Sequence, residues 1–198
     1  MHTFFKNHIV TFLLIIVFSN KLMAFECLEK SPNLLNLKDD YYNLENGSAL
    51  TNNEIDKLNG IYEDIDGRWE GEVNISECSG PDNAPVVNTQ SFSLTADITA
   101  NSSGRLFVAA EIYNKRDNIS GGKNLDLLNS SNIMELKFFN KDHFSYSEKH
   151  RLSNANRSSR LVEHMFDVKR NGDSLAIELS VFVNGVFVTN EAWLLTKK

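Results

Sequence analysis

The sequence predicts an all-β fold: an antiparallel, up-and-down barrel of eight strands with one short helix before the first strand. The main observation is that apolar and polar side chains alternate with period two in successive segments from Gly67 onward, a pattern typical of strands with one buried face. The second is that short turns rich in Asn, Gly and Asp join these segments, with no crossover long enough for parallel strands. A meander of about eight strands can close on itself, which removes its exposed edges. A two-sheet sandwich is the alternative architecture.

The chain has 198 residues, and we expect residues 1–24 to be a secretory signal peptide that is cleaved on export. Lys6 and His8 precede the apolar run 9–18, and Ala24 offers a small residue at the cleavage point. The run is shorter than a membrane-spanning helix requires, so an uncleaved anchor is the second choice. We therefore expect a periplasmic or secreted protein with no membrane insertion after cleavage.

The charge of the chain disfavours two classes of partner. The whole sequence has 20 basic and 26 acidic residues. Removing residues 1–24 removes Lys6 and Lys21 but no acid, which leaves 18 basic against 26 acidic residues and a net charge of −8. An acidic surface repels nucleic acid and anionic lipid, so we expect neither as a partner.

Residues 25–50 are polar and irregular, and we expect them to be a lead-in that a disulfide holds to the barrel. Cys27 lies in this lead-in, and Cys78 lies at the end of the first predicted strand. An even pair of cysteines in an exported chain predicts a disulfide. It would close a loop of about 50 residues and stabilise the fold by ~4 kcal/mol on the chain-entropy model. A redox or metal-binding role for the pair lacks the Cys-x-x-Cys spacing that would support it.

A short amphipathic helix should begin after the lead-in. Thr51 and Glu54 have the spacing of a capping box, with Thr51 as the N-cap and Glu54 bonded back to it. Apolar residues follow at helical spacing: Ile55, Leu58, Ile61, Tyr62 and Ile65. We expect this helix to end near Gly60 or Gly67 and to cover one end of the sheet, with partner binding as the alternative.

The eight strands are expected at residues 66–75, 92–99, 106–113, 133–139, 144–152, 161–168, 175–183 and 186–195. Asn184-Gly185, between the last two strands, is the strongest hairpin signal in the chain and pairs Val183 with Val186. The stretch 114–131 contains two adjacent glycines and shows no clear period, so we expect it to be the longest loop. Long loops at the mouth of a barrel often carry function.

The domain formed by the helix and the barrel, residues 51–198, resembles a known family. A short helix followed by Gly67-Arg68-Trp69 at the head of the first strand is similar to the lipocalins and the wider calycin group. In that family a Gly-x-Trp lies at this place and its Trp plugs the closed end of the barrel, which makes Trp69 the expected barrel plug. The resemblance thus implies a lipocalin-like barrel.

Two further motifs of that family are replaced here. Residues 169–173 stand where the family has a Thr-Asp-Tyr between its sixth and seventh strands. Only Lys197 or Lys198 is available in place of the arginine that packs on the Trp at the end of the last strand.

Strand parity predicts which side chains of the last two strands face the interior. The two-residue turn between them places Asn190, Ala192 and Leu194 on the inner face. On the opposite face it places three large apolar residues: Phe182, Phe187 and Trp193. Unless the helix covers them, they would form an exposed apolar face that favours a protein partner.

The inner face of the fifth and sixth strands contains polar side chains in an apolar lining. Convergent polar groups of this kind are typical of a small-molecule site. With the inner residue of the last strand, the candidate ligand-binding residues are Tyr146, Glu148, His150, His164 and Asn190. The alternative is that Glu148 and His150 satisfy each other or reach solvent at the rim of the barrel.

A metal site would use His143, His150 and His164 with an acid such as Asp142, Glu148 or Glu163. No pair of these residues has helical i, i+4 spacing or another ligand signature. We therefore expect no metal and no other cofactor.

The sequence lacks a recognisable catalytic constellation. It contains no Gly-x-Ser-x-Gly and no Gly-rich phosphate loop after a strand, and the paired acids Asp39-Asp40 lie in the lead-in. We expect a noncatalytic exported barrel that binds a small, largely apolar ligand. The alternative is a protein-binding module, such as an inhibitor, an immunity factor or an envelope-complex subunit, with a fully packed barrel. A pocket of roughly 300 Å³ or more would favour the ligand.

Overall fold

The computed structural model describes residues 26–36, 40–81, 83–153 and 159–198. The described helices and strands are α2 (Pro32–Asn36), α3 (Asn52–Tyr62), β1 (Gly67–Ser79), β2 (Val86–Ala100), β3 (Leu106–Asn114), β4 (Ile119–Leu127), β5 (Ile133–Asn140), β6 (His143–Ser153), β7 (Ser159–Asn171), β8 (Ser174–Val183) and β9 (Val186–Lys197). The expected signal peptide, residues 1–24, lies outside the described residues. Within the described ranges, none of the helices has the length and apolar character needed to span a membrane.

All the described strands belong to one nine-stranded sheet with the order β4-β3-β2-β1-β9-β8-β7-β6-β5. Every neighbouring pair is antiparallel, and β1 pairs with both β2 and β9, so the first and last strands of the meander are joined. β4 and β5 are not hydrogen-bonded neighbours, which makes them the two edges of the sheet. The all-β, up-and-down prediction with a short helix is confirmed. The closed eight-stranded barrel is corrected to nine strands in a sheet that is open between β4 and β5.

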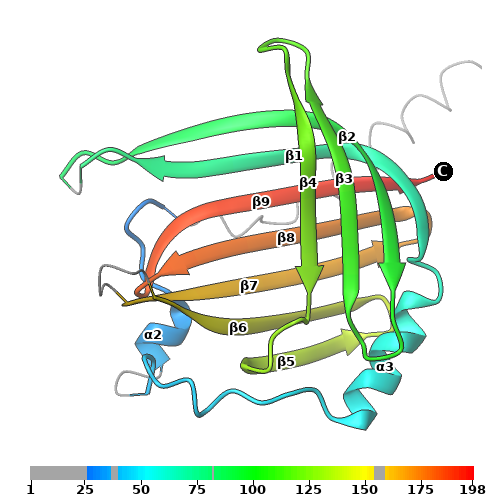
Figure 1. Ribbon diagram of the computed structural model, residues 1–198, viewed down its shortest axis with the longest axis horizontal. Helices are drawn as coiled ribbons and strands as arrows, with labels where there is room; N and C mark the ends of the chain where they lie inside the picture. Colours follow the sequence, from blue (N-terminus) through cyan, green and yellow to red (C-terminus); the bar gives the residue numbers. More distant parts are fainter. Residues whose placement is uncertain (1–25, 37–39, 82, 154–158) are drawn as a thin grey trace, which may run out of the picture.

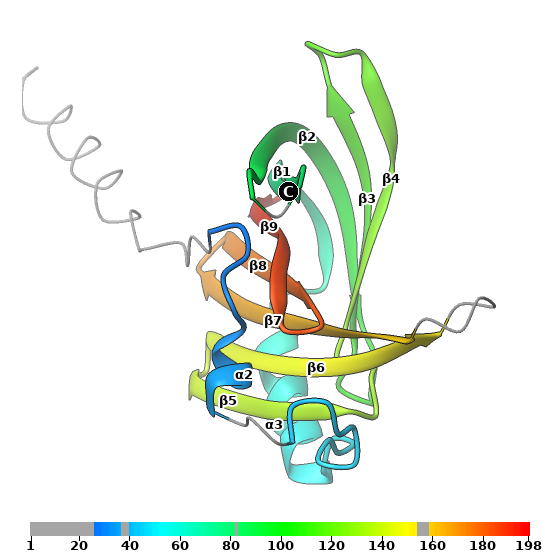
Figure 2. The same cartoon turned by 90° about the vertical axis from the view of Figure 1, so that its left-hand side faces the viewer.

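The sheet is strongly curved, so that β2, β3 and β4 cross over one face of the remaining strands (Figure 1). In the turned view β3 and β4 stand on one side and β6 to β9 on the other, with α3 at one end (Figure 2). The main hydrophobic core fills the concave face between them, with side chains from α3 and from each of the nine strands. The polar groups of the candidate site therefore lie on the inner wall of a curved sheet.

The helix α3 forms as its capping signal predicts. The backbone N–H of Glu54 donates to Thr51 Oγ1 over 3.4 Å, and the N–H of Thr51 donates to Glu54 Oε2 over 2.8 Å. The buried face of α3, made of Leu58, Ile61 and Tyr62, packs on the core. The capping box is thus confirmed, and the helix ends at Tyr62.

Trp69 lies in the core close to α3. Its ring is fully buried, and its Nε1 donates to the carbonyl of Ile65 over 2.8 Å. Lys197, its partner across β1 and β9, places its Nζ 5.7 Å from the ring centroid. This is the contact that the resemblance assigned to an arginine.

The strand β4 lies inside the stretch that was expected to be a loop, and that prediction is wrong. β4 is an edge strand, so its first residues have no second neighbour to bury them, and residues 119–122 are exposed. Only Leu125 and Leu127 at its other end enter the core. An edge strand with adjacent glycines lacks the alternation that marks a half-buried strand.

The parity predicted for β9 is also wrong, because the pairing of β8 with β9 shifts register between Val181 and Phe182. Val183 pairs with Val186 as predicted, but Val181 pairs with Thr189, so β9 contains one extra residue. An extra residue turns every later side chain to the other face. The following residues show the reversal: Trp193 is fully buried in the core, whereas Leu194 is 49 % exposed.

The lead-in packs on the convex side of the sheet, where Figure 2 shows α2 on the side away from β3 and β4. The predicted disulfide Cys27–Cys78 is confirmed and ties this segment to β1. The N–H of Ser31 donates to Gly185 O over 2.9 Å, which joins the lead-in to the turn between β8 and β9.

Phe182 and Phe187 are buried on this convex side rather than exposed. Their rings lie 5.7 Å apart, and the N–H of Phe187 donates to Glu29 O of the lead-in over 2.8 Å. With Trp193 in the core, the expected exposed apolar face does not exist. The lead-in, rather than the helix after it, provides the cover.

Candidate functional site

Three polar side chains of β6 and β7 meet on the concave face: Glu148, His150 and His164. The antiparallel register pairs Glu148 with His164, and His150 is the next inner-face residue along β6. Glu148 is only 3 % exposed, whereas the side chains of His150 and His164 are 37 % and 30 % exposed. The structure thus brings together three of the five predicted ligand-binding residues, named here the Glu–His–His cluster.

Both histidines of the cluster share one carboxylate oxygen. His150 Nε2 lies 2.9 Å from Glu148 Oε1, and His164 Nδ1 lies 3.4 Å from the same atom. The second oxygen, Glu148 Oε2, is buried and has no hydrogen-bond partner among the described residues. Buried polar atoms are nearly always paired, so this oxygen needs an explanation.

The electrostatics of the cluster couple the carboxylate of Glu148 to the two imidazoles. Burial raises the pKa of Glu148, but the hydrogen bonds and charges of His150 and His164 outweigh burial and hold the pKa below its ordinary value. The hydrogen bond that His150 makes to Glu148 raises the pKa of His150, and burial opposes that rise only in part. The carboxylate of Glu148 and the imidazole of His150 therefore each stabilise the charged form of the other.

Tyr146, the fourth predicted residue, is the inner-face residue of β6 that precedes Glu148, and its hydroxyl bonds outside the cluster. Its ring is buried and stacks on Phe166 with ring centroids 4.7 Å apart. Its hydroxyl accepts a hydrogen bond of 3.0 Å from the N–H of Leu128, just after β4, which links β6 to the end of that edge strand. Burial raises the pKa of Tyr146 well above the ordinary value. Tyr146 forms the aromatic floor of the site.

Asn190, the fifth predicted residue, is not part of the cluster, and its assignment to the inner face is wrong. The extra residue in β9 turns it to the convex face, where its Nδ2 donates to Ser180 Oγ and Glu178 Oε1, each over 3.2 Å.

The same register shift puts Glu191 on the inner face, and sequence reasoning missed it. Glu191 Oε1 pairs with Lys123 Nζ of β4 over 2.8 Å, and Trp193 Nε1 donates to Glu191 Oε2 over 3.1 Å. β4 and β9 are not neighbours in the sheet, so this ion pair crosses the concave side. No sequence signal pointed to it, because Lys123 lay in an expected loop and Glu191 on an expected outer face.

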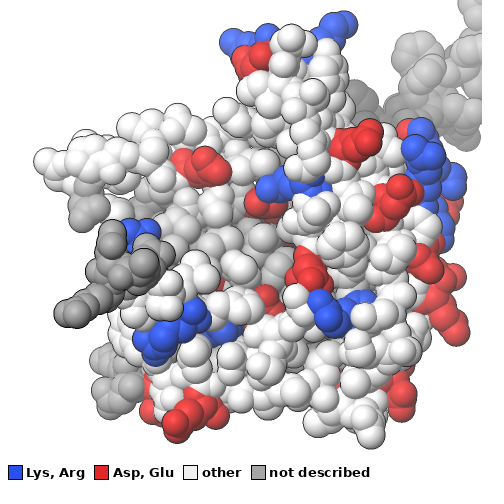
Figure 3. All heavy atoms as spheres, in the orientation of Figure 1, with Lys and Arg blue, Asp and Glu red and all other residues white. Residues whose placement is uncertain are grey.

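The concave face is open to solvent on one side of this crossing. Figure 3 shows the molecule hollowed beside β4, over β7, β8 and β9. The partial exposure of both histidines agrees with access from this side.

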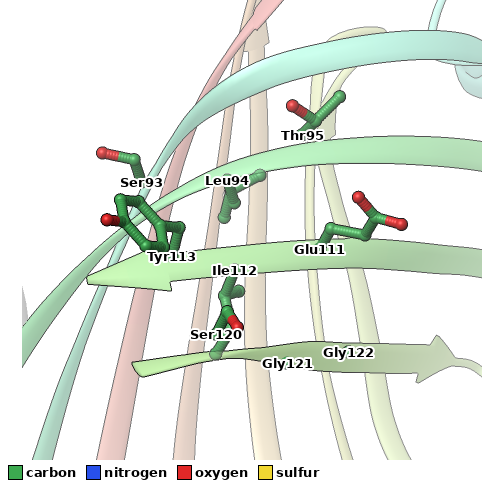
Figure 4. Close-up of a pocket in the computed structure, with 9 residues that line it drawn as sticks. All are labelled: Ser93, Leu94, Thr95, Glu111, Ile112, Tyr113, Ser120, Gly121 and Gly122. Carbon is green, nitrogen blue, oxygen red and sulfur yellow. The ribbon is translucent and has the colours of Figure 1, made fainter. Parts of the chain in front are cut away.

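A second hollow, of about 550 Å³, lies on β2, β3 and β4 (Figure 4). Its walls include Ser93, Thr95, Glu111 and Tyr113, which alternate with core-facing residues along β2 and β3 and so belong to the convex face. No residue of the Glu–His–His cluster lines it. Its volume therefore does not answer whether the interior holds a ligand.

Glu163 and Lys149, neighbours of the cluster in the sequence, face the opposite side of the sheet. Glu163 is fully buried under the lead-in, where it accepts hydrogen bonds from Ser31 Oγ (2.7 Å), Tyr41 Oη (2.8 Å) and Asn33 Nδ2. Lys149 Nζ donates to Tyr41 O over 2.8 Å, and burial lowers the pKa of Lys149. These contacts hold the lead-in in place, and Glu163 is not a member of the candidate metal group.

No protein-family model matches the sequence, and a search of curated proteins found no match to it. The functional argument therefore depends on the geometry of the site.

Proposed function

We propose that the protein is a noncatalytic exported binding protein that holds a small, largely apolar ligand on the concave face of its sheet. The electropositive end of the ligand, a hydrogen-bond donor or a cation, would meet Glu148. The observation that carries this proposal is the buried Glu148 Oε2 without a partner among the described residues. Leaving such an atom unpaired costs about 1–3 kcal/mol, and a bound donor would remove that cost.

The surroundings of the carboxylate favour a ligand with an apolar body. Val162 pairs with His150 across β6 and β7, and Val181 pairs with His164 across β7 and β8. Phe166 is the inner-face residue of β7 that follows His164. A mostly apolar lining with a few polar groups at one end is the usual composition of a small-molecule site.

Binding is favoured over catalysis because both histidines hydrogen-bond to Glu148. In the part of the chain that the structure describes, neither ring has a hydrogen bond to a Ser, Thr or Cys nucleophile. The disulfide supports an oxidising compartment, and we propose a periplasmic or secreted location.

Octylamine tests the proposal, because it combines an apolar chain with an ammonium group. Calorimetric titration should show one octylamine per chain, whereas octanoate, with the same chain and the opposite charge, should bind more weakly. Glu148→Gln keeps the size of the side chain and removes its charge. We expect it to weaken octylamine binding about tenfold or more, as loss of one charge-assisted hydrogen bond predicts.

Asp167→Asn is the matched control, because Asp167 pairs with His143 over 3.1 Å on the convex face. Its affinity for octylamine should equal that of the wild type. Equal affinity in the wild type and Glu148→Gln, or no binding of octylamine at all, would contradict the proposal.

A protein-binding role is the second candidate, and one observation favours it. The hairpin of β3 and β4 projects beyond the other strands (Figure 1), and Tyr113 and Ile119 are exposed on it. β4 also presents an unpaired edge to which a partner strand could add. Under the ligand proposal Tyr113→Ser should leave octylamine binding unchanged.

A further inference from the structure

We propose that Glu148, His150 and His164 form a binding site for one divalent transition-metal ion of the zinc class. The inference deepens the proposed function and rests on it in one respect: it names the electropositive group that Glu148 holds. It does not require the apolar ligand, so the two ideas can fail separately.

The donor set is the first argument. Two imidazole nitrogens and one carboxylate oxygen are the protein ligands of a known class of four-coordinate Zn²⁺ site, in which water is the fourth ligand. Hard cations such as Ca²⁺ and Mg²⁺ prefer oxygen donors throughout, so two imidazoles select against them. Within the described ranges these three residues are a group of His, Cys, Asp or Glu able to share an ion, with one ligand atom each inside 4.8 Å of the others.

The distances between the donor atoms are the second argument. Zinc bonds to nitrogen and oxygen of about 2.0–2.2 Å place tetrahedral ligands roughly 3.3 Å apart. The Glu148 oxygen already lies 2.9 Å from His150 Nε2 and 3.4 Å from His164 Nδ1. The two imidazole nitrogens lie within 4.8 Å of each other, so rotation of the rings has to bring them together before all three atoms can bind one ion.

The unpaired oxygen is the third and independent argument. Glu148 is 3 % exposed, and its Oε2 is buried with no partner among the described residues. A carboxylate that binds a metal can use either oxygen or both. Both histidines contact only Oε1 of Glu148. A metal ion beside the carboxylate would offset the negative charge that is left on the buried Oε2.

The open side of the cluster supplies the fourth argument. A site with three protein ligands keeps one position for water or for another ligand. The side chains of His150 and His164 are 37 % and 30 % exposed, so solvent reaches both rings. A water molecule or another ligand can therefore reach the free position of the ion.

The test is calorimetric titration of the full mature chain with ZnCl₂ after removal of metal with a chelator. We expect one Zn²⁺ per chain and no detectable binding of CaCl₂ under the same conditions. His150→Ala, His164→Ala and Glu148→Gln should each weaken Zn²⁺ binding at least tenfold. His143→Ala is the matched control, because His143 also pairs with a carboxylate, that of Asp167, but lies on the convex face.

Two results would overturn the metal site: no Zn²⁺ bound at one equivalent, or equal Zn²⁺ affinity in all the cluster variants and the wild type. The first would mean that the cluster is a self-satisfied hydrogen-bond network, and the second would assign the ion to other groups. The variants His150→Ala and His164→Ala change partly exposed side chains, so we expect both to fold. They provide the test if Glu148→Gln fails to fold. Visible absorption of bound Co²⁺ checks that the coordination is tetrahedral.

The octylamine titration separates this inference from the proposed function. Octylamine binding without Zn²⁺ binding would refute the metal site and leave the function in place. Zn²⁺ binding without octylamine binding would support the metal site and refute the proposed function.

Discussion

Two buried glutamates on adjacent strands show how a single residue type acquires different roles. Glu163 accepts three hydrogen bonds from the lead-in and is fully used by the fold. Glu148, on the other face, has its Oε1 near two histidines and its Oε2 unpaired. Because burial makes an unpaired charge expensive, the second glutamate is the one to examine for a ligand.

Gly71 is the single residue whose replacement should damage the sheet most directly. A Cβ on Gly71 would lie 1.9 Å from the carbonyl oxygen of Leu194, at the seam between β1 and β9. We predict that Gly71→Ala destabilises the protein by about 3 kcal/mol, the upper range for overpacking, because the two strands must separate. Urea denaturation measures the loss.

Gly122→Ala provides the control for that change, because nothing lies within 4 Å of a Cβ at this position of β4. Its free energy of unfolding should stay within about 0.5 kcal/mol of the wild type. Equal stability of the two variants would show that β1 and β9 tolerate the extra carbon.

Among the elements, α3 is the one whose sequence signals and structure agree most fully. Hydrogen bonds from the backbone N–H and the hydroxyl of Thr51 lower the pKa of Glu54 below 4.5. A carboxyl with a lowered folded pKa stabilises the fold above its unfolded pKa. That stability is lost as the pH falls through the folded pKa.

The pH dependence of the cap can be isolated with Glu54→Gln, since glutamine also closes a capping box but does not titrate. We predict that the wild type is the more stable near pH 6 and that its advantage over Glu54→Gln shrinks as the pH falls to about 3. Urea denaturation of both proteins across this pH range measures the difference in their free energies of unfolding. The other titrating groups are the same in both proteins, so their contributions cancel in that difference. An advantage that grows on acidification would show that the sign is wrong.

In the molecule as a whole, a disulfide and several hydrogen bonds hold the lead-in to the sheet. The disulfide Cys27–Cys78 joins residues 51 apart in the sequence, and Glu163 separately holds Ser31 and Tyr41. The two attachments lie on the same convex side that covers Phe182. The curved strands therefore cover part of the concave face, and the lead-in covers part of the convex face.

Replacing Cys27 and Cys78 by serine should lower the free energy of unfolding by about 4 kcal/mol, the loop-closure value for this separation. Because Ser31 remains bonded to Gly185 and Glu163, we expect hydrogen exchange to rise mainly before Ser31. Wild type treated with dithiothreitol should behave like the double variant. Full loss of the folded sheet in either sample would mean that the Glu163 contacts cannot hold the lead-in alone.

Local signals were enough to predict most strands, the cap of α3 and the disulfide. Alternation along 144–152 and 175–183 located β6 and β8, and Asn184-Gly185 located the hairpin before β9. The same alternation placed Glu148, His150 and His164 on one face. The strands, the cap and the hairpin each depend on residues close together in the sequence, so one stretch of chain contains the information needed. The disulfide could be predicted because the exported chain has one pair of cysteines.

The features that the sequence did not predict depend on how distant strands pair. β4 escaped prediction because an edge strand has only one neighbour to impose a burial pattern, and one extra residue in β9 exchanged Asn190 for Glu191 on the inner face. The gap between β4 and β5 depends on how far the sheet curves, which no single segment encodes. The unpaired oxygen of Glu148 is likewise visible only in the fold, because burial and hydrogen-bond partners are properties of the packed molecule.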